Sequence, residues 1–288
     1  MITCKLMGGL GNQLFQIMAV ISYSIQTNKP FYFIYSDRTI GMTIRKTYWE
    51  SFLSGLSDMI KDKDDISIDE TKNKIIIKEK AFSYHDLDET FSNDNNNNIE
   101  FVGYFQSYKY FDFVHSQIFR LLKLEQQKQT IRNNNLDYDF ENVISMHFRF
   151  SDYKKLPGYY TLLPITYYIK SLQHILTNSK SDQKMKVLYF CEMQDLPIVS
   201  EMINVLEKKF EDLNFEHIKN PEEDWQQMLL MSCCKYNIIA NSTFSWWGAY
   251  LNINYQKIVC YPNQWFGPVL KEKNDTKDLC PSDWIAIF

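Results

Sequence analysis

The chain alternates short apolar runs with longer segments in which apolar residues recur every three to four positions. The short runs are typical of buried β-strands, and the longer segments are typical of helices with one buried face. The predicted strands are residues 2–6, 31–36, 74–78, 99–107, 143–148, 186–192, 236–240 and 257–262. The predicted helices are residues 14–25, 108–124, 164–176, 195–210, 223–234 and a segment that begins near 243.

This alternation of strands and helices predicts an α/β fold built from parallel βαβ units. Residues 125–142 are polar and show little periodicity, which is typical of a linker. Strand and helix signals lie on both sides of it, so we expect two Rossmann-like lobes. The predicted domains are residues 1–135 and 136–288.

Composition narrows the class of protein. The chain has 288 residues, of which 45% are hydrophobic and 23% charged, as expected for a globular protein with a substantial core. Its net charge is −4 and shows no basic stripe, which argues against a nucleic-acid-binding protein. No apolar run reaches the ~18 residues needed to cross a bilayer, and the N-terminus lacks the pattern of a signal peptide. We therefore expect a cytoplasmic protein without an integral membrane segment.

The six cysteines form neither a CxxC motif nor a Cys/His cluster with the spacing of a metal site. Most of them lie in apolar runs, where a thiol behaves as a small buried hydrophobic group. The sequence thus predicts reduced, buried cysteines and no bound metal.

The first cluster of candidate site residues is the glycine-rich stretch "GGLGNQ", which separates the first predicted strand from the first helix. Gly9 and Gly11 would let backbone N–H groups approach an anion at the helix start, and Asn12 and Gln13 add uncharged donors. A nicotinamide-dependent enzyme would need a third glycine where this chain has Leu14, and an acidic residue ~20 positions further on. A tight turn without a ligand remains the alternative.

The second cluster follows the predicted strand in "ISMHFRFSDYKK". His147 and Arg149 alternate with Met146 and Phe148, so the two polar side chains share one face and the apolar pair faces the core. An arginine fixed at a strand end is suited to bidentate phosphate binding. The alternative is a surface salt bridge between Arg149 and Asp152.

The third cluster, in "NSTFSWWGAYL", lies where another predicted strand passes into a helix. Asn241 follows the strand directly, and Ser242 or Thr243 can cap the helix that contains Ser245. Small hydroxyl groups at a helix start again favour an anion. The tryptophan pair that follows is expected to belong to the core.

With these clusters in place, the chain resembles the family 11 glycosyltransferases, the α-1,2-fucosyltransferases of bacterial and viral type. The resemblance lies in "MGGLGNQLFQ", "HFRFSDY", "IIANSTFSWWGAYL" and "YPNQWF" followed by "DLCPSDWI", in that order and spacing. It implies a GT-B-like fold with a cleft between two lobes. It also implies transfer of fucose from GDP-fucose to a glycan acceptor, with inversion and without a cofactor or required metal.

Carried over by position, the family motif H-x-R-R-G-D-Y falls on residues 147–153. The resemblance implies that Arg149 clamps the donor diphosphate, that Gly9, Gly11, Asn12 and Gln13 face the donor, and that residues 241–245 form the nucleotide-binding turn. The chain departs from the motif at two positions, Phe150 for the second arginine and Ser151 for the glycine. A lost arginine contact predicts weaker donor binding or a changed donor, unless Phe150 points into the core.

The expected reaction is direct displacement at the anomeric carbon, in which Arg149 and helix N-termini stabilise the leaving GDP. Asp152 is the first candidate for the general base and His147 the second, with Glu192 and Asp224 as further candidates. The expected acceptor is a galactose hydroxyl, joined in α-1,2 linkage. The alternatives are a glycosyltransferase with another donor and a sugar-nucleotide- or glycan-binding module that has lost transfer.

Overall fold

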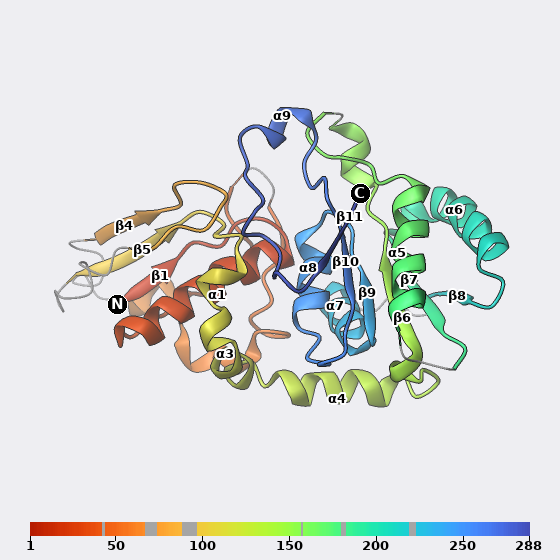
Figure 1. Ribbon diagram of the computed structural model, residues 1–288. Coiled ribbons are helices and arrows are strands. Elements are labelled where there is room, and N and C mark those ends of the chain that lie inside the picture. The colour runs from red at the N-terminus through yellow and green to blue at the C-terminus, as the bar shows by residue number, and fades with distance from the viewer. Residues whose placement is uncertain (42–43, 67–73, 88–96, 157, 180–182, 219–222) are drawn as a thin grey trace. The chain divides into compact units, whose positions relative to one another are not determined.

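Six parallel strands form the larger of the sheets in the computed structural model, which describes residues 1–41, 44–66, 74–87, 97–156, 158–179, 183–218 and 223–288 (Figure 1). The strand order is β11-β10-β9-β6-β7-β8. The first strand in sequence, β6, therefore lies in the middle, and the chain winds outward from it twice, as in a Rossmann fold. The strands are β6 (Val143–His147), β7 (Lys186–Phe190), β8 (Asn214–His217), β9 (Tyr236–Ile238), β10 (Val259–Pro262) and β11 (Ile285–Ile287).

Helices cover both faces of this sheet. Figure 1 shows α5 and α6 on one face and α7 and α8 on the other, the arrangement expected when each half of a sheet is wound with the same hand. These helices are α5 (Ile165–Asn178), α6 (Leu196–Lys209), α7 (Asp224–Cys233) and α8 (Thr243–Tyr250). Shorter helical elements in the same part of the chain are η6 (Phe140–Asn142), η7 (Ser151–Lys155), η8 (Met193–Asp195) and α9 (Pro268–Lys271).

The core beneath α5 and α6 takes every second residue of the chain from Ile144 to Phe150. Ile144, Met146, Phe148 and Phe150 all belong to one buried cluster with side chains of α5, α6 and β7. The expectation that Met146 and Phe148 face the core is confirmed, and Phe150, 4% exposed, lies with them. On the other face of the sheet, Trp246 and Trp247 of α8 are fully buried, as expected of core residues.

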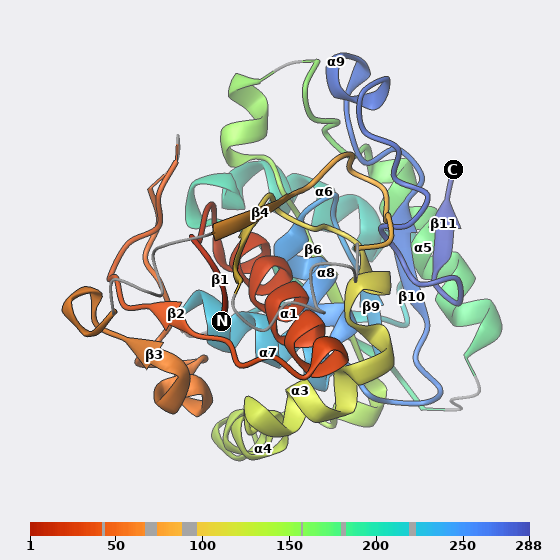
Figure 2. The same cartoon turned by 90° about the vertical axis from the view of Figure 1, so that its left-hand side faces the viewer.

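A second, smaller set of elements surrounds the N-terminal helix α1 (Leu10–Thr27), which packs on β1 (Figure 2). Its main sheet is parallel, with the order β1-β5-β4, and β2 and β3 form a separate parallel pair. The strands are β1 (Ile2–Cys4), β2 (Phe33–Ile34), β3 (Ile60–Lys61), β4 (Lys74–Lys78) and β5 (Asn98–Val102). The remaining elements are η1 (Ser54–Met59), η2 (Lys63–Asp65), η4 (Tyr108–Tyr110), η5 (Asp112–Val114) and α3 (His115–Leu121).

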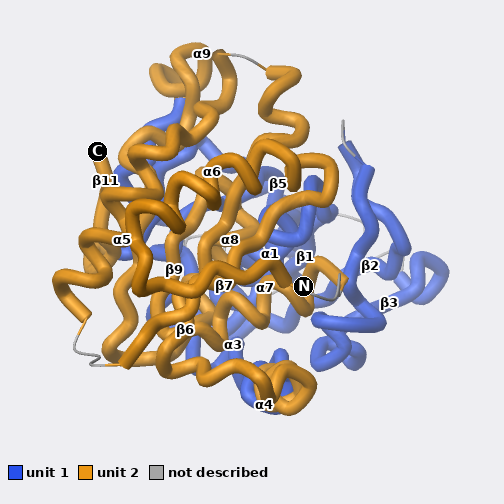
Figure 3. The backbone as a smooth tube through the Cα atoms, turned by 90° about the vertical axis from the view of Figure 1, so that its right-hand side faces the viewer, with its two compact units in different colours: residues 1–127, 274–281 blue, residues 128–273, 282–288 orange. Residues whose placement is uncertain are grey.

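The chain divides into two compact units, coloured separately in Figure 3. Unit 1 comprises residues 1–127 and 274–281, and unit 2 comprises residues 128–273 and 282–288. The boundary expected from the sequence lies between residues 135 and 136, eight residues after the boundary between residues 127 and 128 in the structure. The return of residues 274–281 to unit 1 had no signal in the sequence.

Two sequence expectations about elements are wrong. Residues 125–142 are not a plain linker, because α4 (Leu124–Asn134) occupies their first half. The helix predicted for residues 108–124 is broken into η4, η5 and α3, with Phe111, whose φ of −143° is not helical, between the first two. The polar stretch 91–100 lies partly outside the described residues.

The cysteines follow the sequence expectation. All six are free, and Cys4, Cys233, Cys234 and Cys260 are buried. Burial raises the pKa of the Cys260 thiol to about 12 and the pKa of Cys191 to about 12, so both stay protonated at neutral pH. These thiols therefore behave as small apolar groups.

The buried position of Phe150 makes a direct prediction about the arginine that the family motif has there. Phe150→Arg places a charge in an apolar cluster, 4% exposed, with Lys154 Nζ already 5.4 Å from the centre of the phenyl ring. We expect the free energy of unfolding to fall by about 3 kcal/mol, measured by urea denaturation. The control Phe150→Leu should cost about 1 kcal/mol. An arginine variant as stable as the leucine variant would contradict the packing described here.

Candidate functional site

The strand order of unit 2 reverses between β6 and β9, which are hydrogen-bonded neighbours. In open parallel sheets, ligands bind beyond the carboxyl ends of the strands at such a reversal, because the connecting helices leave it in opposite directions. His147, Arg149 and Asp152 follow β6, and the segment from Asn241 to Ser245 follows β9. The structure thus brings the second and third sequence clusters to one edge of one sheet.

A buried hydrogen bond joins these two clusters. His147 Nδ1 lies 2.8 Å from Ser245 Oγ, and both side chains are buried. Ser245 Oγ also accepts the backbone N–H of Ala240 at 3.2 Å, so the serine ties the end of β9 to the end of β6. On the other side, the Tyr168 hydroxyl donates to the carbonyl oxygen of His147 at 3.2 Å. The histidine is therefore fixed by both its ring and its backbone.

The surroundings of His147 keep its imidazole uncharged. Burial, and then the nearby Arg149, lowers the pKa of His147 from 6.5 to about 3. A base this weak takes up a proton poorly near neutral pH, because catalytic efficiency is greatest when the pKa of the base is close to the working pH. The geometry therefore favours His147 as a neutral hydrogen-bonding and positioning group.

Arg149 is held between two carboxylates. Its guanidinium donates to Asp152 Oδ1 at 2.6 Å and forms an ion pair with Glu192, which follows β7. The arginine side chain is 21% exposed, whereas Asp152 and Glu192 are about half exposed. The surface salt bridge that the sequence left open is therefore present. It occupies both terminal nitrogens of the guanidinium and fixes its direction, while Nε is buried without a hydrogen-bond partner among the described residues.

Tyr153 links the same two strand ends. Its ring stacks on Tyr160, with centres 4.1 Å apart and planes 9° apart, and the guanidinium carbon of Arg149 lies 5.4 Å from the centre of the Tyr153 ring. The Tyr153 hydroxyl donates to the carbonyl oxygen of Asn241 at 2.8 Å. Burial raises the pKa of this hydroxyl, so it stays a hydrogen-bond donor. Sequence analysis placed Tyr153 in the motif but gave it no role.

Asn241, Ser242 and Thr243 form the turn from β9 into α8. Ser242 is the N-cap residue, and its Oγ accepts the backbone N–H of Phe244 at 3.4 Å. The side-chain amide of Asn241 donates to the carbonyl oxygens of Thr161 and Trp265, both at 2.9 Å. Asn241 Oδ1 is buried and has no hydrogen-bond partner among the described residues. Thr243 begins the helix, so the start of α8 lies at the β6–β9 edge.

Ser151, which stands where the family motif has glycine, is part of a polar cluster around the buried carboxylate of Asp195. Its backbone N–H and its hydroxyl both donate to Asp195 Oδ2, at 2.7 and 2.6 Å. Lys154 Nζ donates to the other oxygen of Asp195 at 3.0 Å. Burial alone would raise the pKa of Asp195, but these donors lower it overall. The sequence did not indicate Asp195 as a site residue, because an acidic residue just before a helix is usually an N-cap.

In unit 1, the glycine-rich loop connects β1 to α1. Gly8 has a φ of +77°, which favours glycine, and a Cβ there would approach the Asn12 side chain to 2.6 Å. Gly9 is the N-cap residue of α1, and no atom of the described residues lies within 4 Å of the position of an added Cβ. Gly11 lies buried in the first turn of α1. The loop therefore presents open backbone at Gly9.

Gln13 is fully buried. Its amide nitrogen donates to the carbonyl oxygens of Gly8 and Lys46, at 3.1 and 2.9 Å. Gln13 Oε1 has no partner among the residues that the structure describes. The side chain thus braces the glycine-rich loop from within, whereas Asn12 is only partly buried.

A residue missed by sequence analysis completes this loop. Gln106 Nε2 donates to Asn12 Oδ1 at 2.9 Å, and Gln106 follows β5, the neighbour of β1. Glu79 holds the backbone next to it, because its two oxygens accept the N–H groups of Tyr104 and Phe105, both at 2.8 Å. Gln106 could have been found as a polar residue that follows an apolar strand. It was missed because "GYFQS" continues the apolar pattern, so the predicted strand extended past it.

The described part of the chain contains no group of three or more His, Cys, Asp or Glu side chains placed to hold a metal ion. Among the helices of this part, none is both long enough and apolar enough to pass through a membrane.

Comparison with known proteins decides the family. The sequence profile of glycosyl transferase family 11 matches residues 1–287 of the chain. The chain belongs to glycosyl transferase family 11. It is therefore a glycosyltransferase, and the resemblance found in the four motifs is confirmed.

Two relatives from Escherichia coli are similar to this family 11 glycosyltransferase. One is an alpha-1,2-colitosyltransferase, 26% identical over 99% of this chain and 98% of that protein. The other is the O-antigen biosynthesis glycosyltransferase WbnK, 34% identical over 51% of this chain and 45% of that protein.

Among solved structures, a mutant of FUT1 from Arabidopsis thaliana, in complex with GDP, has a TM-score of 0.50 to this chain. The two sequences are 11% identical, and the alignment covers 90% of this chain and 70% of the FUT1 chain. This likeness concerns the fold alone. The expected α/β fold of GT-B type, with parallel sheets, is confirmed.

The depressed pKa of His147 predicts how stability depends on pH. Below pH 6.5 the unfolded chain gains a proton at His147, whereas the folded chain gains it only near pH 3. Folding stability contributed by this group therefore falls as the pH is lowered from 6.5 towards 3, by about 2 kcal/mol at pH 5. His147→Asn should reduce the loss of unfolding free energy between pH 7 and pH 5 by about that amount.

The control for this measurement is Ser245→Ala, which removes the hydrogen-bond partner but keeps the imidazole. This variant should be less stable than the wild type at every pH and still keep most of the pH dependence. Urea denaturation at pH 7, 6 and 5 gives the three slopes. Equal slopes for wild type and His147→Asn would show that His147 is not a buried neutral group.

Proposed function

We propose that this family 11 enzyme transfers fucose from GDP-fucose to a galactose hydroxyl of a glycan, with inversion and in α-1,2 linkage. Support for the linkage comes from the colitosyltransferase relative, whose name specifies an alpha-1,2 transfer. Support for fucose comes from the resemblance of the four sequence motifs. The proposed partners are thus a nucleotide-sugar donor and a glycan acceptor, and the reaction needs no cofactor.

The observation that carries this proposal is the position of Arg149. It follows β6, the strand at which the sheet order reverses, and its guanidinium is directed by Asp152, Glu192 and the Tyr153 ring. The start of α8 lies at the adjacent strand end, where the positive end of the helix dipole favours an anion. A diphosphate bound at this edge would meet a fixed bidentate donor and a helix N-terminus together.

Arg149 is already paired, so the donor must compete for it. Both carboxylates are about half exposed, and an exposed ion pair contributes little to stability, about 0–1 kcal/mol. A charge-assisted bond to a diphosphate is worth about 1.5–3 kcal/mol, so exchange of a carboxylate for a phosphate oxygen is favourable. We therefore propose that Asp152 and Glu192 orient Arg149 before the donor arrives and release one of its edges when it binds.

In the proposed reaction, the acceptor oxygen attacks the anomeric carbon of the sugar as the bond from that carbon to the diphosphate oxygen breaks. The electron pair of the broken bond leaves with GDP, where Arg149 and the start of α8 stabilise the added negative charge. The proton of the acceptor hydroxyl passes to a general base. Attack from the side opposite to the leaving group inverts the anomeric carbon.

Asp152 is the proposed general base. Its carboxylate is half exposed, so it is open to an acceptor hydroxyl, and it becomes available when a diphosphate takes its place on Arg149. His147 is less suited, because its low pKa makes it a weak base. Glu192 shares the surroundings of Asp152 and is the second carboxylate to test. Asp224 is the first residue of α7, where an acidic side chain stabilises the helix dipole, so we assign it no catalytic role.

A donor other than GDP-fucose has one observation in its favour, the colitosyltransferase relative. Colitose is a close analogue of fucose, so the same site can be expected to accommodate either sugar. The two donors are distinguished by assaying GDP-fucose and GDP-colitose side by side. The Phe150 side chain lies in the core, which removes the main support for a binding module without transfer.

The proposal predicts a specific effect of substituting Arg149. Arg149→Ala should raise the dissociation constant for GDP by about 10- to 150-fold, because a charge-assisted bidentate contact of about 1.5–3 kcal/mol is lost. Arg149→Lys keeps the charge but loses the paired N–H donors of the guanidinium, so its dissociation constant for GDP should lie between those of the alanine variant and the wild type. Titration calorimetry with GDP measures all three.

The matched control is Arg120→Ala, which removes the same charge from an exposed position on α3. This variant should bind GDP as tightly as the wild type, and it corrects for the change in net charge. A GDP affinity for Arg149→Ala equal to that of Arg120→Ala would overturn the role of Arg149.

A further inference from the structure

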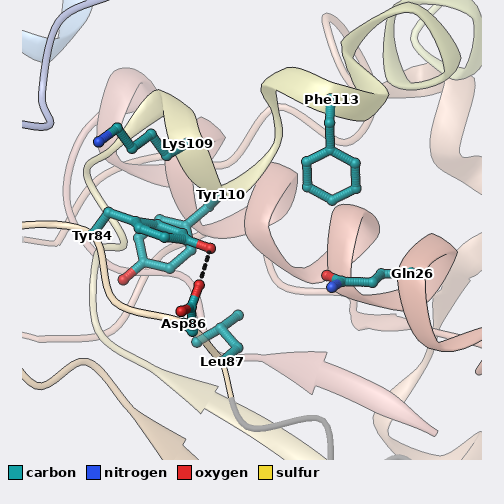
Figure 4. Close-up of a pocket in the computed structure, with 7 residues that line it drawn as sticks. All are labelled: Gln26, Tyr84, Asp86, Leu87, Lys109, Tyr110 and Phe113. Atoms are coloured by element: carbon teal, nitrogen blue, oxygen red, sulfur yellow. Dashed lines mark hydrogen bonds between the residues drawn. The ribbon is translucent and has the colours of Figure 1, made fainter.

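Unit 1 contains a pocket that none of the candidate site residues lines. Its volume is about 420 Å³, within the usual range for pockets that bind small molecules, and it lies between the last turn of α1, η4, η5 and the segment after β4 (Figure 4). Figure 4 shows Phe113 and Gln26 on one side of the opening and Tyr84, Tyr110 and Asp86 on the other. Three aromatic rings therefore surround a space edged by polar groups.

The aromatic wall of this pocket is rigid. Tyr84 and Tyr110 are 4.9 Å apart between ring centres, and the Tyr110 ring also packs edge-on against Phe105 at 5.4 Å. The Tyr110 hydroxyl is hydrogen-bonded to His85 Nδ1 at 3.0 Å. Burial raises the pKa of Tyr84 to about 12, so its hydroxyl is a neutral donor at physiological pH. Phe113, by contrast, is 61% exposed and offers its ring to a ligand.

The charges of the pocket select against a phosphate. Among the described lining residues the only cation is Lys109, which is paired with Asp278 Oδ1 at 2.5 Å, and Asp278 also accepts the backbone N–H of Tyr84 at 3.2 Å. The remaining charged lining group is Asp86, an exposed carboxylate that accepts the Tyr84 hydroxyl at 2.8 Å. An anionic nucleotide would meet this carboxylate with no unpaired cation among the described lining residues, whereas a neutral ligand with hydroxyl donors would not be repelled.

We propose that this pocket binds a neutral sugar ring of the acceptor glycan, with the sugar packed against Phe113 and a sugar hydroxyl donating to Asp86. An aromatic face beside a carboxylate matches a sugar, which presents apolar C–H groups on its ring faces and hydroxyl donors at its edge. The inference rests on the proposed function, because it supplies a site for the acceptor of that reaction.

The pocket is distinct from the glycine-rich loop of the same unit. Gln26 lies in the last turn of α1 and Gln13 in its first, which separates them by about 20 Å along the helix axis. A sugar in the pocket is therefore a residue of the acceptor remote from the loop that is expected to face the donor. The pocket thus selects extended glycans over short ones.

The test uses a galactose-ended tetrasaccharide, lacto-N-neotetraose, and its short counterpart, lactose. Phe113→Ala should raise the dissociation constant for the tetrasaccharide by about tenfold, and Asp86→Asn by about fivefold, measured by saturation-transfer NMR titration. In transfer assays, the KM for the tetrasaccharide should rise likewise, with kcat, the KM for the donor and the KM for lactose unchanged.

The matched control is Ile76→Ala on β4 of the same unit. Ile76 is 63% exposed, close to the 61% of Phe113, and it does not line the pocket. This control should bind the tetrasaccharide like the wild type. An effect of Phe113→Ala no larger than that of Ile76→Ala overturns the proposal, and so does a wild type that binds no tetrasaccharide at millimolar concentration.

The two Asp86 outcomes separate a sugar from an anion. Tighter binding of GDP to Asp86→Asn than to the wild type, with unchanged glycan binding, would assign the pocket to an anionic ligand and overturn the proposal. Glycan binding that depends on Phe113, in a protein that does not transfer fucose, would support the pocket and contradict the proposed donor. If the wild type and the Phe113 and Asp86 variants transfer fucose equally well to both glycans, the proposed donor is supported and the pocket proposal is contradicted.

Discussion

The hydrogen bond between His147 and Ser245 is the interaction on which the candidate site depends. It joins the ends of β6 and β9, the two strands between which the sheet order reverses. Because the pair is buried, the imidazole stays neutral, and the chain can hold Arg149 two residues further on without a second cation beside it. Tyr153 provides a second link between these strand ends, because its hydroxyl donates to the carbonyl oxygen of Asn241. The site is thus a product of strand order and of two polar links across it.

Much of the larger unit could be predicted from the sequence, because its strands are fully buried and therefore appear as apolar runs. The alternation from Ile144 to Phe150 even gave the correct core face. The edge strands β8 and β11 were missed, since each is short and only partly buried. Helix α4 was missed for another reason. Its buried face contains Leu124, Lys128 and Ile131, and a buried lysine, which donates to the carbonyl oxygen of Leu251, reads as polar.

The site could be predicted only in part. Residue types after buried strands indicated His147, Arg149, Asp152 and the turn from Asn241 to Ser245, because strand ends are where a parallel sheet binds ligands. The partners of these residues could not be predicted. Glu192 reaches Arg149 from β7, and Gln106 reaches Asn12 from β5, and such pairs depend on strand order rather than on spacing. The pocket in unit 1 has the same origin, since its residues come from segments far apart in the sequence.

The position that departs most from the family motif, Phe150, is explained by the same alternation. Successive residues of an extended segment point to opposite faces, so Phe150 faces the core and Arg149 faces the strand-end edge. The site therefore relies on one arginine, oriented by two carboxylates and a tyrosine ring. The most direct test of a GDP-sugar site at this edge is a thermal-shift comparison of GDP-fucose, other GDP-sugars and UDP-sugars at equal concentration. GDP-fucose should raise Tm and UDP-sugars should not, whereas a UDP-sugar that stabilises the protein where GDP-fucose has no effect would contradict the proposed donor.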